Sequence, residues 1–219
     1  MAVKIVFLDC DGTLTSIKSS WQHVHERLGL WDDRADEFQS LFRAGRISYH
    51  EFCARDASLW KGFPAEQIQA IIDEIDYHEG VAETLRALHS EGIMTVIIST
   101  GLSRLVDKAK NELGATFAVA NELVERDGLI TGEIRINVEH DQKGLWVRKI
   151  LAEMGLRREE AAAVGDSEGD RGMFEEVALA IGYHPTPGVL PFLDHALYDG
   201  SFTQVLEVMK LAGRRCARS

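Results

Sequence analysis

From residue 80 onward, the sequence alternates between short apolar runs, which predict strands, and longer segments with helical periodicity. Strands that alternate with helices of this length indicate an α/β fold, in which a doubly wound, mainly parallel sheet is covered by helices on both faces. Asp127-Gly128 predicts a hairpin within this alternation, because the two residues tolerate the positive φ angles of a tight turn. We expect strands at residues 94–99, 116–120, 161–164 and 179–181, and helices at residues 81–91, 103–113, 144–154, 171–177 and 202–211.

The stretch before residue 80 follows a different pattern. Residues 4–8 form a continuous apolar run, which predicts a strand buried on both faces. Four helical signals follow without a strand between them, starting near Ser20, at residue 32 or 33, at Ser48 and at Pro64. We therefore expect a core made of residues 1–15 and 80–219, with residues 16–79 inserted as a helical cap.

The charge balance argues against two classes of partner. The 219 residues contain 24 Lys and Arg against 35 Asp and Glu, a formal net charge of −11, and no dense basic run occurs before Arg214. We therefore expect no nucleic acid and no membrane surface among the partners. The apolar runs are too short to span a bilayer, and the N-terminus lacks the basic segment and cleavage site of a signal peptide. Three scattered cysteines, Cys10, Cys53 and Cys216, indicate reduced thiols and a cytoplasmic protein.

The segment Asp9-Cys10-Asp11-Gly12-Thr13 follows the first predicted strand directly. In open α/β sheets, ligands bind at the carboxyl ends of the strands. Two carboxylates at positions i and i+2 point to opposite sides of a regular strand, so we expect them to converge only because Gly12 lets the chain leave extended geometry. We interpret Cys10 as a small buried residue, since no Arg follows at the short spacing that a cysteine phosphatase needs.

Three further groups fall where predicted strands end or predicted helices begin. Ser99-Thr100-Gly101 offers a hydroxyl and free backbone N–H groups, which suit a phosphate, although a plain helix cap explains the same residues. Lys143 opens its helix, where a cation is unfavourable, so it indicates a nearby anion or a solvated side chain. The loop at residues 165–170, with the sequence GDSEGD, offers hard oxygen ligands suited to Mg²⁺.

The order of these groups is the four-motif pattern of the haloacid dehalogenase-like phosphohydrolases: DxDGT, then Ser or Thr, then Lys, then GDxxxD. The sequence resembles that superfamily over essentially its whole length, and its helical insert, hairpin and motif spacing are most similar to the phosphoserine phosphatase branch. The resemblance implies a Rossmann-like core. Phosphatases and phosphotransferases of the superfamily carry the second acid, here Asp11, whereas its dehalogenases lack it. The resemblance therefore favours phosphate chemistry.

The resemblance also implies a mechanism with an aspartyl-phosphate intermediate. Asp9 would be the nucleophile, and Asp11 would protonate the leaving group and then activate water. Mg²⁺ would be bound by Asp9, Asp166 and the main-chain carbonyl of Asp11, with Asp170 orienting this set. The phosphoryl oxygens would be held by Ser99, Thr100, Gly101 and Lys143.

The expected substrate is a small phosphorylated metabolite. Lys18 stands where phosphoserine phosphatases have a Glu that meets the substrate amine, so the sequence disfavours phosphoserine and favours a second anionic group. Arg55 lies near the position of the cap arginine that binds the substrate carboxylate in that branch. Two alternatives stay open: a phosphotransferase that moves the phosphoryl group to an alcohol, and a non-catalytic phospho-ligand binder. The oligomeric state is also open. We expect the cap to close as a lid, with hinges at residues 15–18 and 77–80.

Overall fold

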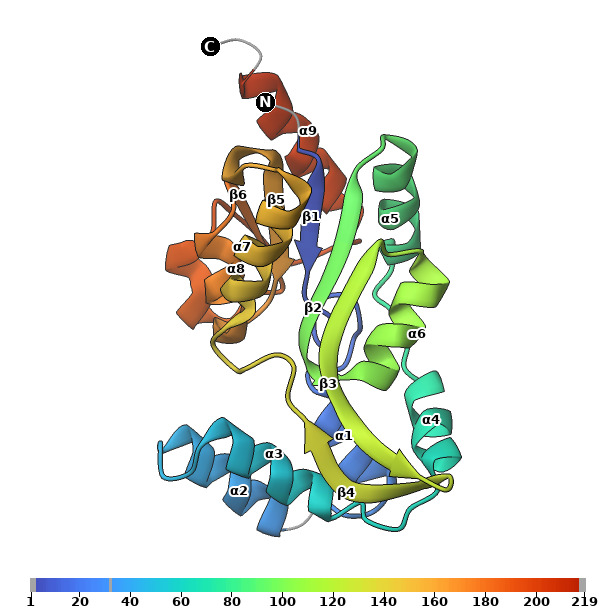
Figure 1. Ribbon diagram of the computed structural model, residues 1–219. Helices are drawn as coiled ribbons and strands as arrows, with labels where there is room; N and C mark the ends of the chain where they lie inside the picture. The colour runs from blue at the N-terminus through green and yellow to red at the C-terminus, as the bar shows by residue number, and fades with distance from the viewer. Residues whose placement is uncertain (1–2, 32, 217–219) are drawn as a thin grey trace.

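In the computed structural model, which describes residues 3–31 and 33–216, the chain forms a seven-stranded sheet covered by helices (Figure 1). The strand order is β4-β3-β2-β1-β5-β6-β7, and each neighbouring pair is parallel except the β3–β4 hairpin. The predicted doubly wound, mainly parallel sheet is thereby confirmed. The strands are β1 (Ile5–Leu8), β2 (Met94–Leu102), β3 (Phe117–Arg126), β4 (Leu129–Arg135), β5 (Ala161–Gly165), β6 (Leu179–Tyr183) and β7 (His195–Leu197).

Strand β1 lies at the centre of the sheet and is buried on both faces. Val6 and Leu8 belong to the core cluster formed with one helical layer, whereas Ile5 and Phe7 belong to the cluster formed with the other. This burial explains why the strand is a continuous apolar run. The first layer contains α5 (Val81–Ser90), α6 (Ser103–Leu113) and α9 (Gln204–Cys216), and the second contains α7 (Lys143–Met154) and α8 (Arg171–Glu175). Short 3-10 turns occur at Arg158–Glu160, Glu168–Asp170 and Pro187–Phe192.

The four helices expected before residue 80 are present, and they lie beyond the carboxyl ends of β1 and β2 (Figure 1). They are α1 (Ser20–Arg27), α2 (Asp33–Arg43), α3 (Tyr49–Ser58) and α4 (Ala65–Asp73). Ser48 caps α3 through a capping box with Glu51, as its sequence indicates. Helix α1 differs by one residue from expectation, because Ser19 is the cap and Ser20 is the first helical residue. Residue 32, the other expected start of α2, lies outside the described residues.

The hairpin of β3 and β4 is longer than the sequence indicates, and it reaches from the sheet to these helices (Figure 1). Its turn is the predicted one, with φ angles of 53° at Asp127 and 75° at Gly128. Three main-chain hydrogen bonds join the hairpin to the segment before α4: Gly62 N to Ile130 O, Ile130 N to Phe63 O and Ala65 N to Gly128 O. The division into residues 16–79 and a core stays a prediction, since this hairpin contributes to both regions.

Two further expectations concern membranes and thiols. Within residues 3–31 and 33–216, none of the helices has both the length and the apolar composition that a membrane crossing requires. Cys10 and Cys53 are buried free thiols, and the side chain of Cys216 lies outside the described part of the chain.

Candidate active site

The turn after β1 carries the first two acids of the site. The N–H groups of residues 13–15 donate to the carbonyl oxygen of Cys10, and Gly12 has a φ of 82°. Because the chain leaves extended geometry here, Asp9 and Asp11 line the same cavity, which has a volume of about 470 Å³. A Cβ atom at residue 12 would lie 2.6 Å from Oδ2 of Asp166, so only glycine allows the β5 loop to approach this closely.

Cys10, between the two acids, is fully buried and is not among the residues that line this cavity. Burial, together with the charges of Asp11 and Asp9, raises the pKa of the Cys10 thiol well above its ordinary value. A protonated, enclosed thiol is a poor nucleophile. The side chain therefore acts in packing.

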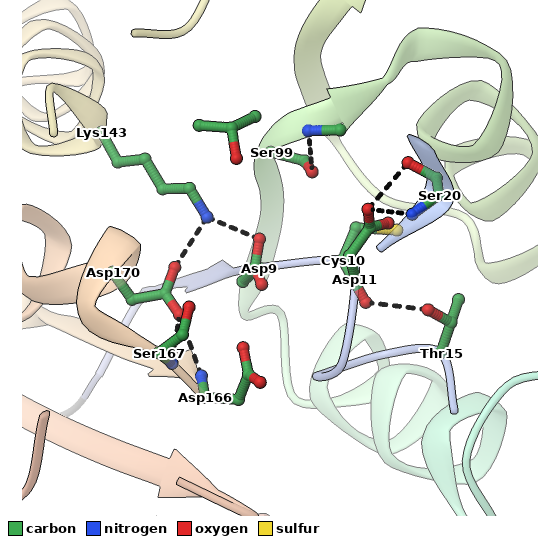
Figure 2. A network of polar contacts seen from close by, with 12 residues as sticks. Asp9, Cys10, Asp11, Thr15, Ser20, Ser99, Lys143, Asp166, Ser167 and Asp170 are labelled. Atoms are coloured by element: carbon green, nitrogen blue, oxygen red, sulfur yellow. Dashed lines mark hydrogen bonds and ion pairs between the residues drawn. The ribbon is translucent and has the colours of Figure 1, made fainter. Parts of the chain in front are cut away.

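Lys143 joins two of the acids. Its Nζ lies 2.5 Å from Oδ1 of Asp9 and 2.6 Å from Oδ1 of Asp170, and only 3% of the side chain is exposed (Figure 2). Burial acts to lower the pKa of Lys143, but the charges of Asp170 and Asp9 outweigh it, and the net pKa is above the ordinary value. A cation therefore begins α7 because two buried carboxylates face it.

Asp9, Asp166 and Asp170 form a buried acidic cluster, in which one oxygen of each lies within 4.8 Å of the others. Asp170 is fixed by the main-chain N–H groups of Asp166 and Ser167, which donate to its Oδ2 at 2.9 and 3.1 Å. Burial and the charge of Asp170 raise the pKa of Asp9 well above its usual range, and they raise that of Asp166 to about 6.

The three carboxylates of the cluster outnumber Lys143 and Lys18, the two lysines that contact them. Carboxylate oxygens are the ligands that hard divalent cations such as Mg²⁺ prefer. The acidic cluster therefore fits such a cation in both its charge and its ligand atoms.

Asp11 is held by the start of α1. Both the main-chain N–H and the hydroxyl of Ser20 donate to its Oδ2, each at 2.7 Å (Figure 2). The N–H of Leu102 donates to the same hydroxyl at 3.1 Å. Among the described residues, the buried Oδ1 of Asp11 has no hydrogen-bond partner. Burial raises the pKa of Asp11, while the bonds from Ser20 act to lower it. Ser20 is one site residue that the sequence reasoning missed, because that reasoning made it the cap of the helix, whereas Ser19 is the cap.

Ser99, Thr100 and Gly101 reach the cavity, but not as the start of a helix. Strand β2 continues through them to Leu102, because its pairing with β3 resumes after an irregularity that follows Ile98. The Gly101 N–H donates to the Ser99 hydroxyl at 2.9 Å. These three residues line the same cavity as Asp9. Helix α6 begins at Ser103, as expected, but the three residues before it belong to β2 and not to a turn at the helix start.

Lys18 and Arg55, the two residues expected to select the substrate, are placed differently from each other. Lys18 lines the cavity, and its Nζ lies 3.0 Å from Oδ2 of Asp166, so it faces a carboxylate of the acidic cluster. Arg55 is not among the residues that line the cavity, and its guanidinium lies 5.6 Å from the ring centroid of Phe38. The structure therefore does not bring Arg55 to the site.

The face of α3 that does line the cavity carries Tyr49, Phe52 and Asp56, at positions i, i+3 and i+7. Arg55 is one residue out of phase with this face. Further aromatic rings on the same side of the cavity belong to Trp21, Trp31 and Phe42.

Comparison with known proteins agrees with this geometry. The family model of the haloacid dehalogenase-like hydrolases matches residues 6–175. A phosphoserine phosphatase of Methanocaldococcus jannaschii is 26% identical over 208 residues, which are 94% of this chain and 98% of the relative. Another, from Halobacterium salinarum, is 29% identical over 195 residues, 88% of this chain and 92% of the relative. A solved phospho-aspartyl intermediate analogue of phosphoserine phosphatase superposes with a TM-score of 0.83 at 25% identity, covering 95% of this chain and 99% of that one.

Proposed function

The chain belongs to the haloacid dehalogenase-like hydrolase family, and from this premise we propose that it is a Mg²⁺-dependent phosphatase that hydrolyses a small phosphomonoester, as phosphoserine phosphatases do. The observation that carries the proposal is the contact of Lys143 with Asp9 and Asp170, because it joins three of the four motifs around one buried ammonium group. The similarity of the whole chain to phosphoserine phosphatases supports the same reaction class.

In the first step, a carboxylate oxygen of Asp9 attacks phosphorus, and the bond between phosphorus and the ester oxygen breaks. Asp11 gives its proton to that oxygen. Burial raises the pKa of Asp11, which keeps the proton available at a higher pH than an exposed carboxyl would allow. The alcohol then leaves, and the phosphoryl group remains on Asp9.

In the second step, ionised Asp11 takes a proton from water, and the oxygen of that water attacks phosphorus. The bond between phosphorus and Asp9 breaks, and inorganic phosphate is released. Ser20 holds Asp11 in place throughout, since its two donors contact Oδ2 and leave Oδ1 for the transferred proton.

Positive charge must balance the phosphoryl oxygens. Lys143 supplies one charge, held in place by Asp170. A Mg²⁺ ion bound by Asp9, Asp166 and the main-chain carbonyl of Asp11, with Asp170 orienting them, would supply further charge neutralisation to the phosphoryl group. The Ser99 hydroxyl lies in the same cavity and would donate to a phosphoryl oxygen.

The proposal is tested with p-nitrophenyl phosphate as a generic substrate. We expect hydrolysis with Mg²⁺, none with a chelator, and a fall in kcat of at least about 1,000-fold in Asp9→Asn. Asp199→Asn, which removes the same charge from an exposed position of the core, should keep the wild-type rate. Hydrolysis that persists in Asp9→Asn or in chelator would contradict the proposal.

A further inference from the structure

Helix α3 forms one wall of the active-site cavity, and it carries Asp56, a carboxylate with no Lys or Arg partner among the described side chains. Asp56 lines the cavity and is only 3% exposed. Its Oδ1 is buried and has no hydrogen-bond partner among the described residues. The basic nitrogen recorded near it, Nε2 of His25, lies 3.7 Å away, which is beyond hydrogen-bond distance.

His25 does not neutralise Asp56. The indole N–H of Trp60 donates to Nδ1 of His25 at 3.0 Å. An indole nitrogen is only ever a donor, so Nδ1 accepts this bond, while Nε2, which faces Asp56, has no hydrogen-bond partner among the described residues. No Lys or Arg whose side chain the structure describes forms an ion pair with Asp56. A buried carboxylate left in this state is costly, and a cationic ligand would remove that cost.

The surroundings of Asp56 suit an ammonium group. Tyr49 and Phe52 lie on the same face of α3 as Asp56, and Trp31 and Phe42 line the same cavity. The faces of aromatic rings attract ammonium ions, and the attraction grows when water is excluded. A primary ammonium group would also donate the hydrogen bond that Asp56 lacks.

The lysines that line the cavity contact the acidic cluster and not Asp56. Among the side chains that the structure describes, Lys143 and Lys18 are the lysines and arginines that line the cavity, and both contact carboxylates of the acidic cluster. The carboxylate of a substrate would therefore find no described cation beside the aromatic rings. An ammonium group would find both a counter-ion and aromatic side chains there.

We infer that the substrate is the phosphomonoester of an amino alcohol without a carboxylate, and that Asp56 binds its ammonium group among the aromatic rings of the cap. The inference rests on the proposed phosphatase function and names the substrate class. Asp56 is thus a specificity-determining residue of the site, in the place where Arg55 was expected to bind a carboxylate.

Three esters of nearly equal size test the inference on the wild-type enzyme. Phosphoethanolamine carries the ammonium group, propyl phosphate replaces that group with a methyl, and phosphoserine adds a carboxylate. We expect kcat/KM for phosphoethanolamine to exceed the value for each of the other two by at least about 10-fold. Equal values for phosphoethanolamine and propyl phosphate, or a preference for phosphoserine, would overturn the inference while leaving the phosphatase function intact. Failure to hydrolyse any ester, p-nitrophenyl phosphate included, would instead refute the proposed function.

The variant Asp56→Asn tests whether the preference for phosphoethanolamine depends on Asp56. Asp56→Asn keeps the shape of the side chain and removes its charge, so the preference for phosphoethanolamine over propyl phosphate should fall to about 1. Glu66→Gln removes one negative charge from an exposed position of α4 and should keep the wild-type preference. A preference that survives in a folded Asp56→Asn protein would exclude Asp56 as the counter-ion. If that variant does not fold, the comparison of esters on the wild-type enzyme still decides whether an ammonium group is recognised.

Discussion

Ser20 presents the carboxylate of Asp11 to the cavity through two donors on one oxygen. The same hydroxyl accepts from Leu102, which is the last residue of β2. The start of α1 is thus connected to the carboxyl ends of both β1 and β2, and the orientation of Asp11 depends on all three elements.

Ser20→Ala should lower kcat about 10-fold, because a charge-assisted hydrogen bond to Asp11 is lost while the main-chain N–H remains. KM should change little, since Ser20 does not have to contact the substrate for this effect. Steady-state kinetics separates the two parameters. Ser19→Ala is the matched control: it removes the cap of α1 and should cost about 1 kcal/mol of unfolding free energy without lowering kcat. A fall in kcat that is as large in Ser19→Ala would show that helix stability alone is responsible.

Single residues also show how far the sequence could be interpreted. The acids after β1 and β5 follow buried strands whose ends are clear in the sequence, so their meeting at one edge of the sheet is predictable. The prediction for Arg55 depended on the helical phase of α3, in which an error of one residue rotates a side chain about the helix axis by about 100°. The partner of Ser20 is nine residues away in the sequence and lies across a turn, and no local pattern indicates such a contact.

At the scale of elements, strands β1 and β5 are joined by an ion pair beside their starts as well as by the hydrogen bonds of the sheet. Nζ of Lys4 lies 2.7 Å from Oε1 of Glu160, which directly precedes β5, and the N–H of Arg157 donates to Oε2 at 3.0 Å. The bonds from Lys4 and then Arg157 lower the pKa of Glu160 to about 2, from an ordinary value of 4.5. Both strands end at the active site, so this pairing also fixes their relative position there.

Because the pKa of Glu160 is lower in the folded state, its carboxylate stabilises the fold above about pH 4.5, and that contribution disappears as the pH falls toward 2. In Glu160→Gln, the unfolding free energy should therefore be lower than in the wild type above pH 4.5 and should fall less steeply between pH 4.5 and 2. Urea unfolding over a pH series measures the slope. Glu159→Gln, at the exposed neighbouring position, should retain the wild-type slope. Identical slopes for all three proteins would contradict the prediction.

The elements differ from expectation where tertiary pairing decides their length. Strand β2 runs beyond its apolar run because it pairs with β3 as far as Leu102, and β3 continues to Arg126 because it pairs there with β4. Strand β7 has three residues and pairs with β6 at the edge of the sheet, and so short a run carries no periodicity. Helix α6, which ends at Gly114, was predictable to within a residue, although no side chain caps its start.

At the scale of the whole molecule, the helices before residue 80 contact the core across the cavity. The hydroxyl of Tyr49 donates to the carbonyl oxygen of Thr100 at 3.1 Å and accepts from Nδ2 of Asn121 at 3.0 Å. The indole N–H of Trp21 donates to the same carbonyl at 3.4 Å. These contacts hold α1 and α3 against the ends of β2 and β3, and they would keep water out during phosphoryl transfer.

Tyr49→Phe should weaken this closed arrangement, because it removes the hydroxyl and keeps the ring. A hydrogen bond contributes about 1 kcal/mol, so we expect KM to rise about fivefold and hydrogen exchange in α3 to accelerate by a similar factor. Tyr198→Phe, at an exposed position of the core, should alter neither quantity. Unchanged KM and exchange in Tyr49→Phe would mean that the hydroxyl does not hold the two parts together.

The tip of the β3–β4 hairpin is bonded to residues 62–65, although the hairpin extends from the central sheet. If residues 16–79 swung away as one rigid piece, those three main-chain bonds would have to break. Helix α3 also packs against β4, where a Cβ atom at Gly132 would lie 3.3 Å from Cα of Ser58, so a body that swings with α3 must carry the hairpin with it. In a chimera that takes only residues 16–79 from a relative, these residues would have to bond to a hairpin tip from a different protein. A chimera designed to change substrate preference should therefore also take residues 128–130 from the same relative.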